Sequence, residues 1–233
     1  MRKRAYFCKE VDARERKQVK KEKIVLVGSG QHARVVLYNL KEQGVYEVAC
    51  FLDADPEKIG TIYEGYEVAG TYEDLDCIRE RFQTNKFFIA FGSMHSRKAV
   101  YEKFVSKGWE AVNIFHPDAV ISPDAKIGKG VLIECGCLIT PNPTIGDNVV
   151  VNTGSQVNHD NVIENHVYIA SGVVLSGGVT IRENTLLDDG VIVTLGRSVG
   201  KNCIIGAGGV VTKNVPDNTV AYGCPAKVIR TNE

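Results

Sequence analysis

The chain has 233 residues, which is enough for two modest domains that each bury a core. Its 28 basic residues balance its 28 acidic residues, and this balance argues against a dedicated nucleic-acid-binding protein. No apolar run reaches the roughly 18 residues that a membrane helix needs, and no signal peptide is expected. The seven cysteines are irregularly spaced, so we expect reduced thiols, a cytoplasmic protein and no zinc knuckle.

The N-terminus, residues 1–22, is predicted to be a charged extension. Residues 1–23 hold ten basic and four acidic side chains. We interpret this segment as a solvated arm or a short surface helix. Contact with an acidic partner or a membrane surface is the functional alternative.

Residues 23–114 are predicted to form a small Rossmann-like domain. Apolar runs of the kind found in buried parallel strands alternate with segments of helical spacing. The expected strands are 24–27, 48–52 and 87–91, and the expected helices are 32–40, 72–83 and 95–107. Such alternation favours a doubly wound parallel sheet.

After Phe115 the period of the sequence changes. An apolar residue falls at every sixth position as far as Val211, seventeen times without a break. A helix cannot use this period, because six residues rotate it by about 240° beyond a full turn. A single strand cannot run for so many residues. We therefore expect a parallel β-helix over residues 115–212, with three hexads to a coil, followed by a C-terminal tail over 213–233.

Six short motifs occur in order around this repeat. They are Gly28-Ser29-Gly30-Gln31-His32, Phe51-Leu52-Asp53, Ala90-Phe91-Gly92 with Arg97, His116-Pro117, Asn158-His159-Asp160, and Gly223-Cys224-Pro225-Ala226-Lys227. Together with the repeat they resemble the left-handed β-helix sugar acetyltransferases of bacillosamine, perosamine and sialic acid pathways. The resemblance implies a left-handed coil, acetyl-CoA as donor, a nucleotide-linked amino sugar as acceptor, and a homotrimer with sites between subunits.

His159 is the candidate general base. It stands at a polar corner between two inward residues, so its ring should point away from the coil. A corner histidine bonded to backbone is an equal alternative from the residues alone, and the resemblance favours catalysis by direct transfer. Asp160 or Asn152 is expected to orient the ring. The histidines fit no three-histidine zinc site of the carbonic anhydrase type, so no metal is expected.

Acetyl-CoA is expected to lie along glycine-rich corners of the coil, although corner geometry alone also explains most of these glycines. The candidate contacts are Tyr168, Gly177, Gly178, Ala207, Gly208, Lys213, Pro225 and Lys227. Tyr168 stands where the family often has a histidine. It is expected to donate a hydrogen bond to the acetyl group or merely to line the site.

The first domain is expected to choose the acceptor. The candidate contacts are Gly30, Gln31, His32, Asp53, Gly92 and Arg97. The glycine-rich loop, with Asp53 twenty residues after Ala33, also fits an NAD-binding fingerprint. A sialic acid O-acetyltransferase and a non-catalytic nucleotide-sugar-binding scaffold are two further hypotheses for the function of the chain.

Overall fold

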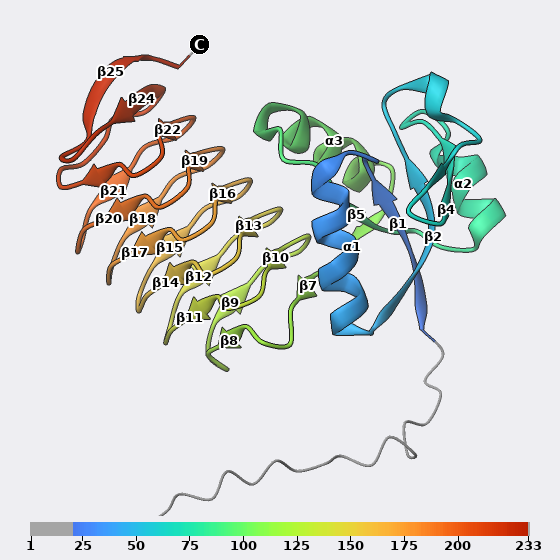
Figure 1. Ribbon diagram of the computed structural model, residues 1–233, viewed down its shortest axis with the longest axis horizontal. Helices are drawn as coiled ribbons and strands as arrows, with labels where there is room; N and C mark the ends of the chain where they lie inside the picture. Colours follow the sequence, from blue (N-terminus) through green and yellow to red (C-terminus); the bar gives the residue numbers. More distant parts are fainter. Residues whose placement is uncertain (1–20, 233) are drawn as a thin grey trace, which may run out of the picture.

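The computed structural model describes residues 21–232, so nearly all of the predicted extension 1–22 lies outside the described residues. Figure 1 shows an α/β part beside a stack of triangular coils. Within the described range, no helix combines the length and the apolar character that crossing a membrane requires.

The α/β part is a six-stranded sheet in the order β3-β4-β2-β1-β5-β6. Its strands are β1 (Glu22–Val27), β2 (Tyr46–Leu52), β3 (Ile62–Tyr63), β4 (Tyr66–Gly70), β5 (Lys86–Ile89) and β6 (Glu110–Ala111). The helices are α1 (Gln31–Gln43), the 3-10 turn η1 (Pro56–Lys58), α2 (Leu75–Phe82) and α3 (Met94–Ser106). The parallel sheet is confirmed, with β3 antiparallel to β4 at one edge.

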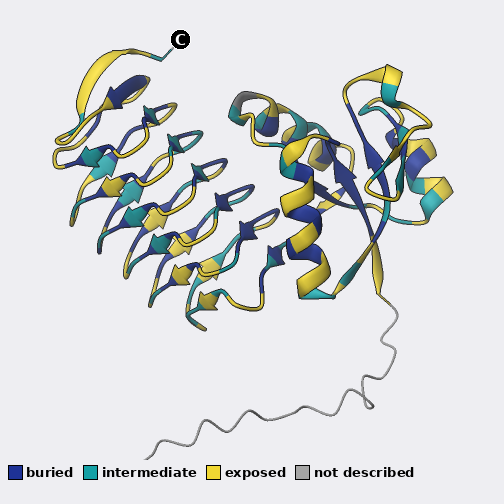
Figure 2. Cartoon of the chain, in the orientation of Figure 1, coloured by how far each residue is buried: buried dark blue, intermediate teal, exposed yellow. Residues whose placement is uncertain are grey.

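The central strand β1 explains why the sheet has two covered faces. Ile24 and Leu26 pack with α1, whereas Val25 and Val27 pack with α2 and α3. All four of these side chains are fully buried. The unbroken apolar run of β1 is therefore the signature of a strand buried on both sides, and Figure 2 shows the sheet as the buried centre of this part.

The coils form a parallel β-helix with three faces. The first face holds β7 (Ile114–Phe115), β10 (Leu132–Ile133), β13 (Val150–Val151), β16 (Tyr168–Ile169), β19 (Leu186–Leu187), β22 (Ile204–Ile205), β24 (Thr219–Tyr222) and β25 (Lys227–Thr231). The second face holds β8 (Val120–Ile121), β11 (Leu138–Ile139), β14 (Gln156–Val157), β17 (Val174–Leu175), β20 (Ile192–Val193) and β23 (Val210–Val211). The third face holds β9 (Lys126–Ile127), β12 (Thr144–Ile145), β15 (Val162–Ile163), β18 (Thr180–Ile181) and β21 (Ser198–Val199).

The six-residue period is confirmed as the inward register. Every predicted inward side chain from Ile133 to Val211 is at most 1% exposed, and they form one continuous core. The first three, Phe115, Ile121 and Ile127, are only partly buried because no coil covers them. A second set of inward residues at the corners was not predicted: Val131, Cys137, Val149, Val167, Val173, Val179, Val191 and Cys203.

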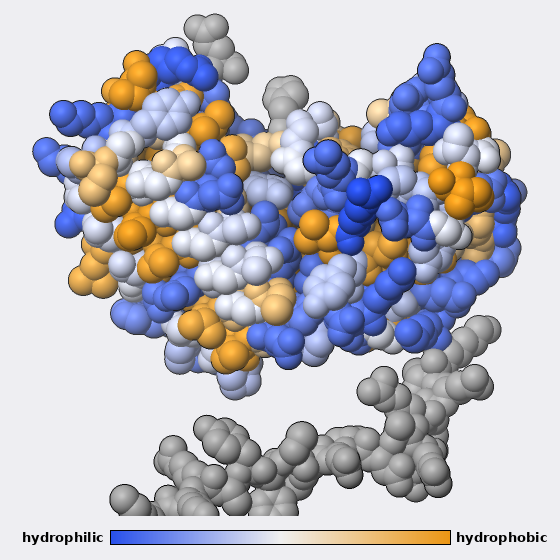
Figure 3. All heavy atoms as spheres, in the orientation of Figure 1, coloured by the Kyte–Doolittle hydropathy of each residue, from blue (hydrophilic) through white to orange (hydrophobic). Residues whose placement is uncertain are grey.

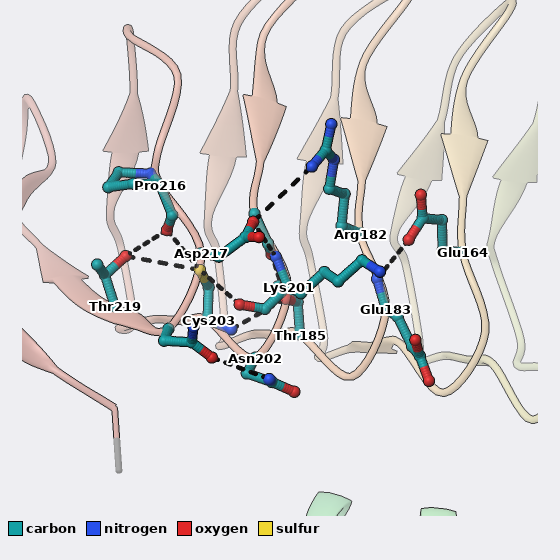
Figure 4. A network of polar contacts seen from close by, with 12 residues as sticks. Glu164, Arg182, Glu183, Thr185, Lys201, Asn202, Cys203, Pro216, Asp217 and Thr219 are labelled. Carbon is teal, nitrogen blue, oxygen red and sulfur yellow. Dashed lines mark hydrogen bonds and ion pairs between the residues drawn. The ribbon is translucent and has the colours of Figure 1, made fainter.

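We name the turns by the faces they join. The first edge joins the first face to the second, the second edge joins the second to the third, and the third edge returns to the first. Successive coils are linked along these edges by side chains as well as by backbone. On the third edge, Figure 4 shows the backbone N–H of Lys201 bonded to Asp217 at 2.9 Å, and that of Glu183 bonded to Glu164 at 2.9 Å.

The α/β part packs on the first face of the β-helix. Ile114, Leu132 and Val150 point outward from that face and belong to the same buried cluster as α1. On the third edge, Lys98 of α3 pairs with Glu183 at 2.6 Å. The α/β part is therefore fixed to one face of the coil, and the second face is left open in the single chain.

Candidate functional site

His159 and Asp160 form a bonded pair on the second edge. The ring Nδ1 lies 2.9 Å from Asp160 Oδ2, and Asn142 Nδ2 donates to Asp160 Oδ1 at 2.7 Å. The bonds from His159 and then from Asn142 lower the pKa of Asp160 below its usual value. An ionised Asp160 makes Nδ1 the protonated nitrogen, so Nε2 carries the lone pair. No residue in the described range bonds Nε2, which leaves it free to take a proton.

Gly177, one coil later on the same edge, lies against the His159 ring. A Cβ at Gly177 would collide with Cε1 and Nε2 of the imidazole. The next residue, Gly178, donates its backbone N–H to the His159 carbonyl at 2.9 Å. Gly177 was predicted as an acetyl-CoA contact. Its lack of a side chain also leaves the space that the His159 ring occupies.

Asn152 has a different partner from the one expected. Its Nδ2 donates to the Tyr168 hydroxyl at 3.1 Å, and its Oδ1 is buried without a partner among the described residues. Asn152 lies on the first edge, whereas His159 lies on the second. Of the two predicted partners, only Asp160 therefore bonds the His159 ring within one chain.

Tyr168 lies at the junction of the two domains rather than beside His159. Its ring is tilted against His32, with centroids 6.1 Å apart, and its hydroxyl faces Gly92. Burial, followed by the charge of Arg97, lowers the pKa of His32 to about 4, so this imidazole is neutral at physiological pH. His32 and Gly92, two of the predicted acceptor contacts, thus meet the residue expected to contact the acetyl group.

The remaining predicted acetyl-CoA residues surround the second face. Gly177, Gly178 and Lys213 follow His159 along the second edge, and Ala207 and Gly208 lie on the first edge. The tail reaches the same face at the last coil, where Ala226 donates its backbone N–H to the Val210 carbonyl at 2.7 Å. Its neighbours Pro225 and Lys227 therefore lie at the end of the second face.

A pocket of about 570 Å³ opens at the carboxyl ends of β1, β2 and β5. This is the switch point of the sheet, because β2 and β4 lie on one side of β1 and the later strands β5 and β6 lie on the other. Such folds bind ligands at this point. Its lining is largely apolar and includes Gly28, Ser29, Gly30, Asp53, Ala54, Lys58, Tyr72, Phe91, Ser93, Ser96, Ala99 and Val100. Two predicted acceptor contacts, Gly30 and Asp53, therefore line this pocket, and Gln31 is exposed at the first turn of α1.

Asp53 organises the loop at the base of this pocket. Its Oδ2 accepts the Ser29 N–H at 2.9 Å, the Ser29 hydroxyl, and Lys58 Nζ at 3.0 Å. Burial alone would raise the pKa of Asp53, but the bonds from Ser29, Lys58 and Asp55 outweigh burial and hold it at about 2. An acid that binds a ribose needs free acceptor atoms, so these internal bonds weigh against the NAD-binding alternative.

Arg97 does not reach the pocket. It is 3% exposed, and its guanidinium donates to the carbonyls of Ile89 and Phe91 and to Asn148 Oδ1. The prediction that Arg97 contacts the acceptor directly does not match this geometry, because the side chain folds under the loop.

Sequence reasoning missed Lys58, Tyr72, Ser93 and Ser96 as pocket residues. Ser93 and Ser96 follow the recognised Ala90-Phe91-Gly92 segment at the start of α3. Their place at the beginning of the predicted helix, directly after this motif, could have identified them as pocket residues. Lys58 follows Asp53 by five residues and is the last residue of η1, and no pattern in the sequence placed it beside the loop.

Outside this site, one group in the described range has metal-ligand residue types: His116, Asp118 and Cys135. His116 Nδ1 already accepts the backbone N–H of Asp118 at 3.1 Å, and its ring stacks on Tyr38. These contacts make it a turn-stabilising histidine.

Comparison with known proteins gives consistent results for the two domains. Residues 23–104 match the PglD N-terminal domain family. A curated relative, UDP-N-acetylbacillosamine N-acetyltransferase of Bacillus subtilis strain 168, is 30% identical over 111 residues. That stretch is 47% of this chain and 50% of the relative, so the chain matches about half the length of that protein.

Two solved structures match over most of the chain. A mutant of GDP-perosamine N-acetyltransferase from Caulobacter crescentus, in complex with CoA and GDP-perosamine, has a TM-score of 0.84 and 35% identity, covering 89% of this chain and 96% of that one. The acetyltransferase domain of PglB from Neisseria gonorrhoeae, with acetyl coenzyme A, has a TM-score of 0.81 and 28% identity, covering 90% and 100%. The chain therefore belongs to the family of left-handed β-helix sugar N-acetyltransferases with a PglD-type N-terminal domain.

Proposed function

We propose that this protein transfers the acetyl group of acetyl-CoA to the amine of a nucleotide-linked amino sugar, with His159 as the general base. The observation that carries the proposal is the His159–Asp160 pair, whose free Nε2 lies on a glycine-lined edge of an acetyltransferase β-helix. The perosamine and bacillosamine relatives, by name, act on amines of this kind.

The proposed reaction needs no acyl-enzyme. His159 Nε2 takes a proton from the amine as its nitrogen attacks the thioester carbon, and Asp160 stabilises the imidazolium that forms. The tetrahedral intermediate collapses, the C–S bond breaks, and the thiolate of CoA leaves with the electron pair. A backbone N–H at the bare glycine corners supplies a donor for the oxyanion.

We propose a homotrimer with its sites between subunits. The second face carries an outward aliphatic row, and Figure 3 shows apolar patches over the β-helix. Exposed members of this row are Val120, Leu138 and Ile192. Because the first domain packs on the first face and His159 lies beyond the second, a subunit docked on the second face would bring its acceptor domain to His159. Lys213 and Lys227, at the end of this face, suit the phosphates of CoA.

The acceptor pocket suits a nucleotide. The N-terminus of α1 has no side-chain cap and no acidic residue in its first turn, so its free N–H groups favour an anion. The apolar lining, including Tyr72 and Phe91, suits a base. We propose that the reaction takes place in the cytoplasm, and the free thiols of the six cysteines in the described range support this.

The test is release of free thiol from acetyl-CoA with a panel of UDP-, GDP- and dTDP-linked amino sugars. We expect turnover with at least one of them, and a loss of about 10²-fold or more in the His159→Ala variant. Acetyl-CoA binding by calorimetry should survive in that variant. Near-normal turnover by His159→Ala, or release only with free sialic acid, would overturn the proposal. Light scattering should give about three times 25.5 kDa, and Leu138→Glu should lower both that mass and the activity.

A further inference from the structure

His166 breaks the pattern of the third edge. The residues at its left-handed corner position are Gly130, Asn148, His166, Asn184, Asn202 and Asn218, all with φ between 52° and 71°. Asparagine adopts this conformation readily and bonds to the next coil, as Asn184 Nδ2 does to Asn202 Oδ1 at 2.9 Å. Only one of the six positions holds an ionisable side chain, and that position lies opposite α3.

His166 ends a chain of hydrogen bonds that begins in the nucleotide-binding domain. Arg97 Nη1 donates to the carbonyls of Ile89 and Phe91, both at 2.9 Å, and Nη2 donates to Asn148 Oδ1 at 2.7 Å. Asn148 Nδ2 lies 3.0 Å from His166 Nδ1. Arg97, Asn148 and His166 are all at most 8% exposed, so each lost bond leaves a buried group without a partner.

The direction of each bond follows from Arg97. A guanidinium can only donate, so the oxygen of Asn148 must face it and the amide NH₂ must face His166. His166 Nδ1 must then accept, which requires a neutral ring with its proton on Nε2. A proton on Nδ1 would set two donors against each other in a buried position.

The loop held by this chain belongs to the nucleotide pocket. Residues 90–93 join β5 to α3, and Phe91 and Ser93 line the pocket. Phe91 also packs against Gly28, where a Cβ would lie 2.7 Å from Phe91 Cδ1. A shift of this loop therefore changes both walls of the pocket.

We propose that His166 is a positioning residue for the acceptor site: through Asn148 it fixes Arg97, and Arg97 fixes the loop 90–93 against the β-helix. The proposal deepens the proposed function and rests on it only for its kinetic readout. His166 touches no substrate. Its role is to hold the nucleotide pocket at a fixed position relative to the coil that contains His159.

The surroundings of His166 make this chain of hydrogen bonds depend on pH. Charged groups face it from α3 (Arg97, Lys98 and Glu102) and from the next coil (Glu183), and the Tyr101 ring packs edge-on with centroids 5.5 Å apart. Burial, then Lys98, lowers the pKa of His166 below its usual 6.5. The unfolded chain thus binds the proton more readily than the native state does. The arrangement is intact above pH 6.5 and is lost as the pH falls through the lowered pKa.

The first experiment follows amide hydrogen exchange at residues 90–93, expressed as protection factors at pH 7.5 and 4.5. We expect the wild type to lose protection at the lower pH. His166→Asn, which keeps an acceptor and suits the left-handed corner, should stay protected at both values. His166→Leu should be unprotected at both. Asn184→Ala is the matched control, because it removes a ladder bond from the same edge without touching Arg97 and should behave as the wild type does.

The second experiment measures kinetics at pH 7.5. His166→Leu should raise KM for the nucleotide sugar about tenfold with KM for acetyl-CoA unchanged, and His166→Asn should restore it. Equal effects of His166→Leu and Asn184→Ala, or no rescue by His166→Asn, would overturn the proposal. So would unaltered protection in both His166→Leu and the wild type at pH 4.5, and the wild-type arm needs no variant to fold. A wild type that turns over no amino sugar refutes the proposed function and leaves the exchange result to decide this proposal.

Discussion

Replacing Gly177 with alanine should lower catalysis by displacing His159 while leaving the fold intact. The backbone at Gly177 is not left-handed, since its φ lies outside the positive range, and Leu195 occupies the same corner position one coil later. The coil therefore accepts a side chain at this position. What stands in the way is the His159 ring, because an added methyl group would overlap its Cε1 and Nε2.

The size of the effect follows from that overlap. Non-bonded carbon atoms are comfortable at about 3.5 Å or more, so the ring must move by roughly 1 Å. A misplacement of this size at a catalytic group costs about 10²-fold in rate. Moving the ring also strains its 2.9 Å bond to Asp160. We expect kcat to fall about 10- to 100-fold, with KM for the nucleotide sugar and the melting temperature nearly unchanged.

A double-mutant cycle tests the cause. Thiol release is measured for the wild type, Gly177→Ala, His159→Ala and the double variant. In the His159→Ala background the added methyl group meets no ring, so Gly177→Ala should have no further effect. Equal losses in both backgrounds would refute the reasoning. A raised KM for acetyl-CoA would instead make Gly177 mainly a donor contact.

Three other substitutions test the partner of the candidate base, the loop at the base of the pocket, and the core of the β-helix. Asp160→Asn removes the charge that stabilises the imidazolium, so kcat should fall about tenfold or more in the same thiol assay, with acetyl-CoA binding retained. Asp53→Asn should cost about 1–2 kcal/mol of unfolding free energy in urea at pH 7. Because the folded pKa of Asp53 is about 2, this difference from the wild type should persist at neutral pH and vanish as the pH falls from about 4 to 2. Leu175→Ala empties a fully buried position in the middle coils and should cost about 3 kcal/mol by urea unfolding; a loss under about 1 kcal/mol would contradict the close packing of the core.

The inward register of the β-helix was predictable because the period of six leaves no other regular structure. The corner residues that share the core, such as Val131 and Val149, were not predicted, because their position two residues before the inward one also holds polar residues such as Ser155. In the first domain the long, apolar strands were predicted to within a few residues. The short strands β3, β4 and β6 were missed because they have two to five residues and lie toward the sheet edges.

For the candidate site, sequence-based prediction failed where contacts join residues that are distant in the chain. His159 and Asp160 are neighbours in sequence, so Asp160 was one of the two candidates, with Asn152, to orient the ring. Asn152 and Tyr168 are sixteen residues apart, and their bond depends on an edge and a face of successive coils. Arg97 illustrates the same difficulty, because its burial under the loop follows from the docking of two domains and from no local pattern.

The residues at the left-handed corners of the β-helix distinguish one coil from the others. In the β-helix, left-handed corners with side chains are filled mainly by asparagine, which tolerates this conformation well. Within the described coils, the residues other than glycine and asparagine at positive φ are Asp160 and His166. Aspartate and histidine also adopt this conformation more readily than most residues, so what sets these two positions apart is their titratable side chain. Asp160 bonds the candidate base, and His166 ends the chain of hydrogen bonds to the loop between β5 and α3. Both stand in the same coil, on neighbouring edges, so we propose that a single turn of the β-helix orients the candidate base on one edge and the β5–α3 loop on the next.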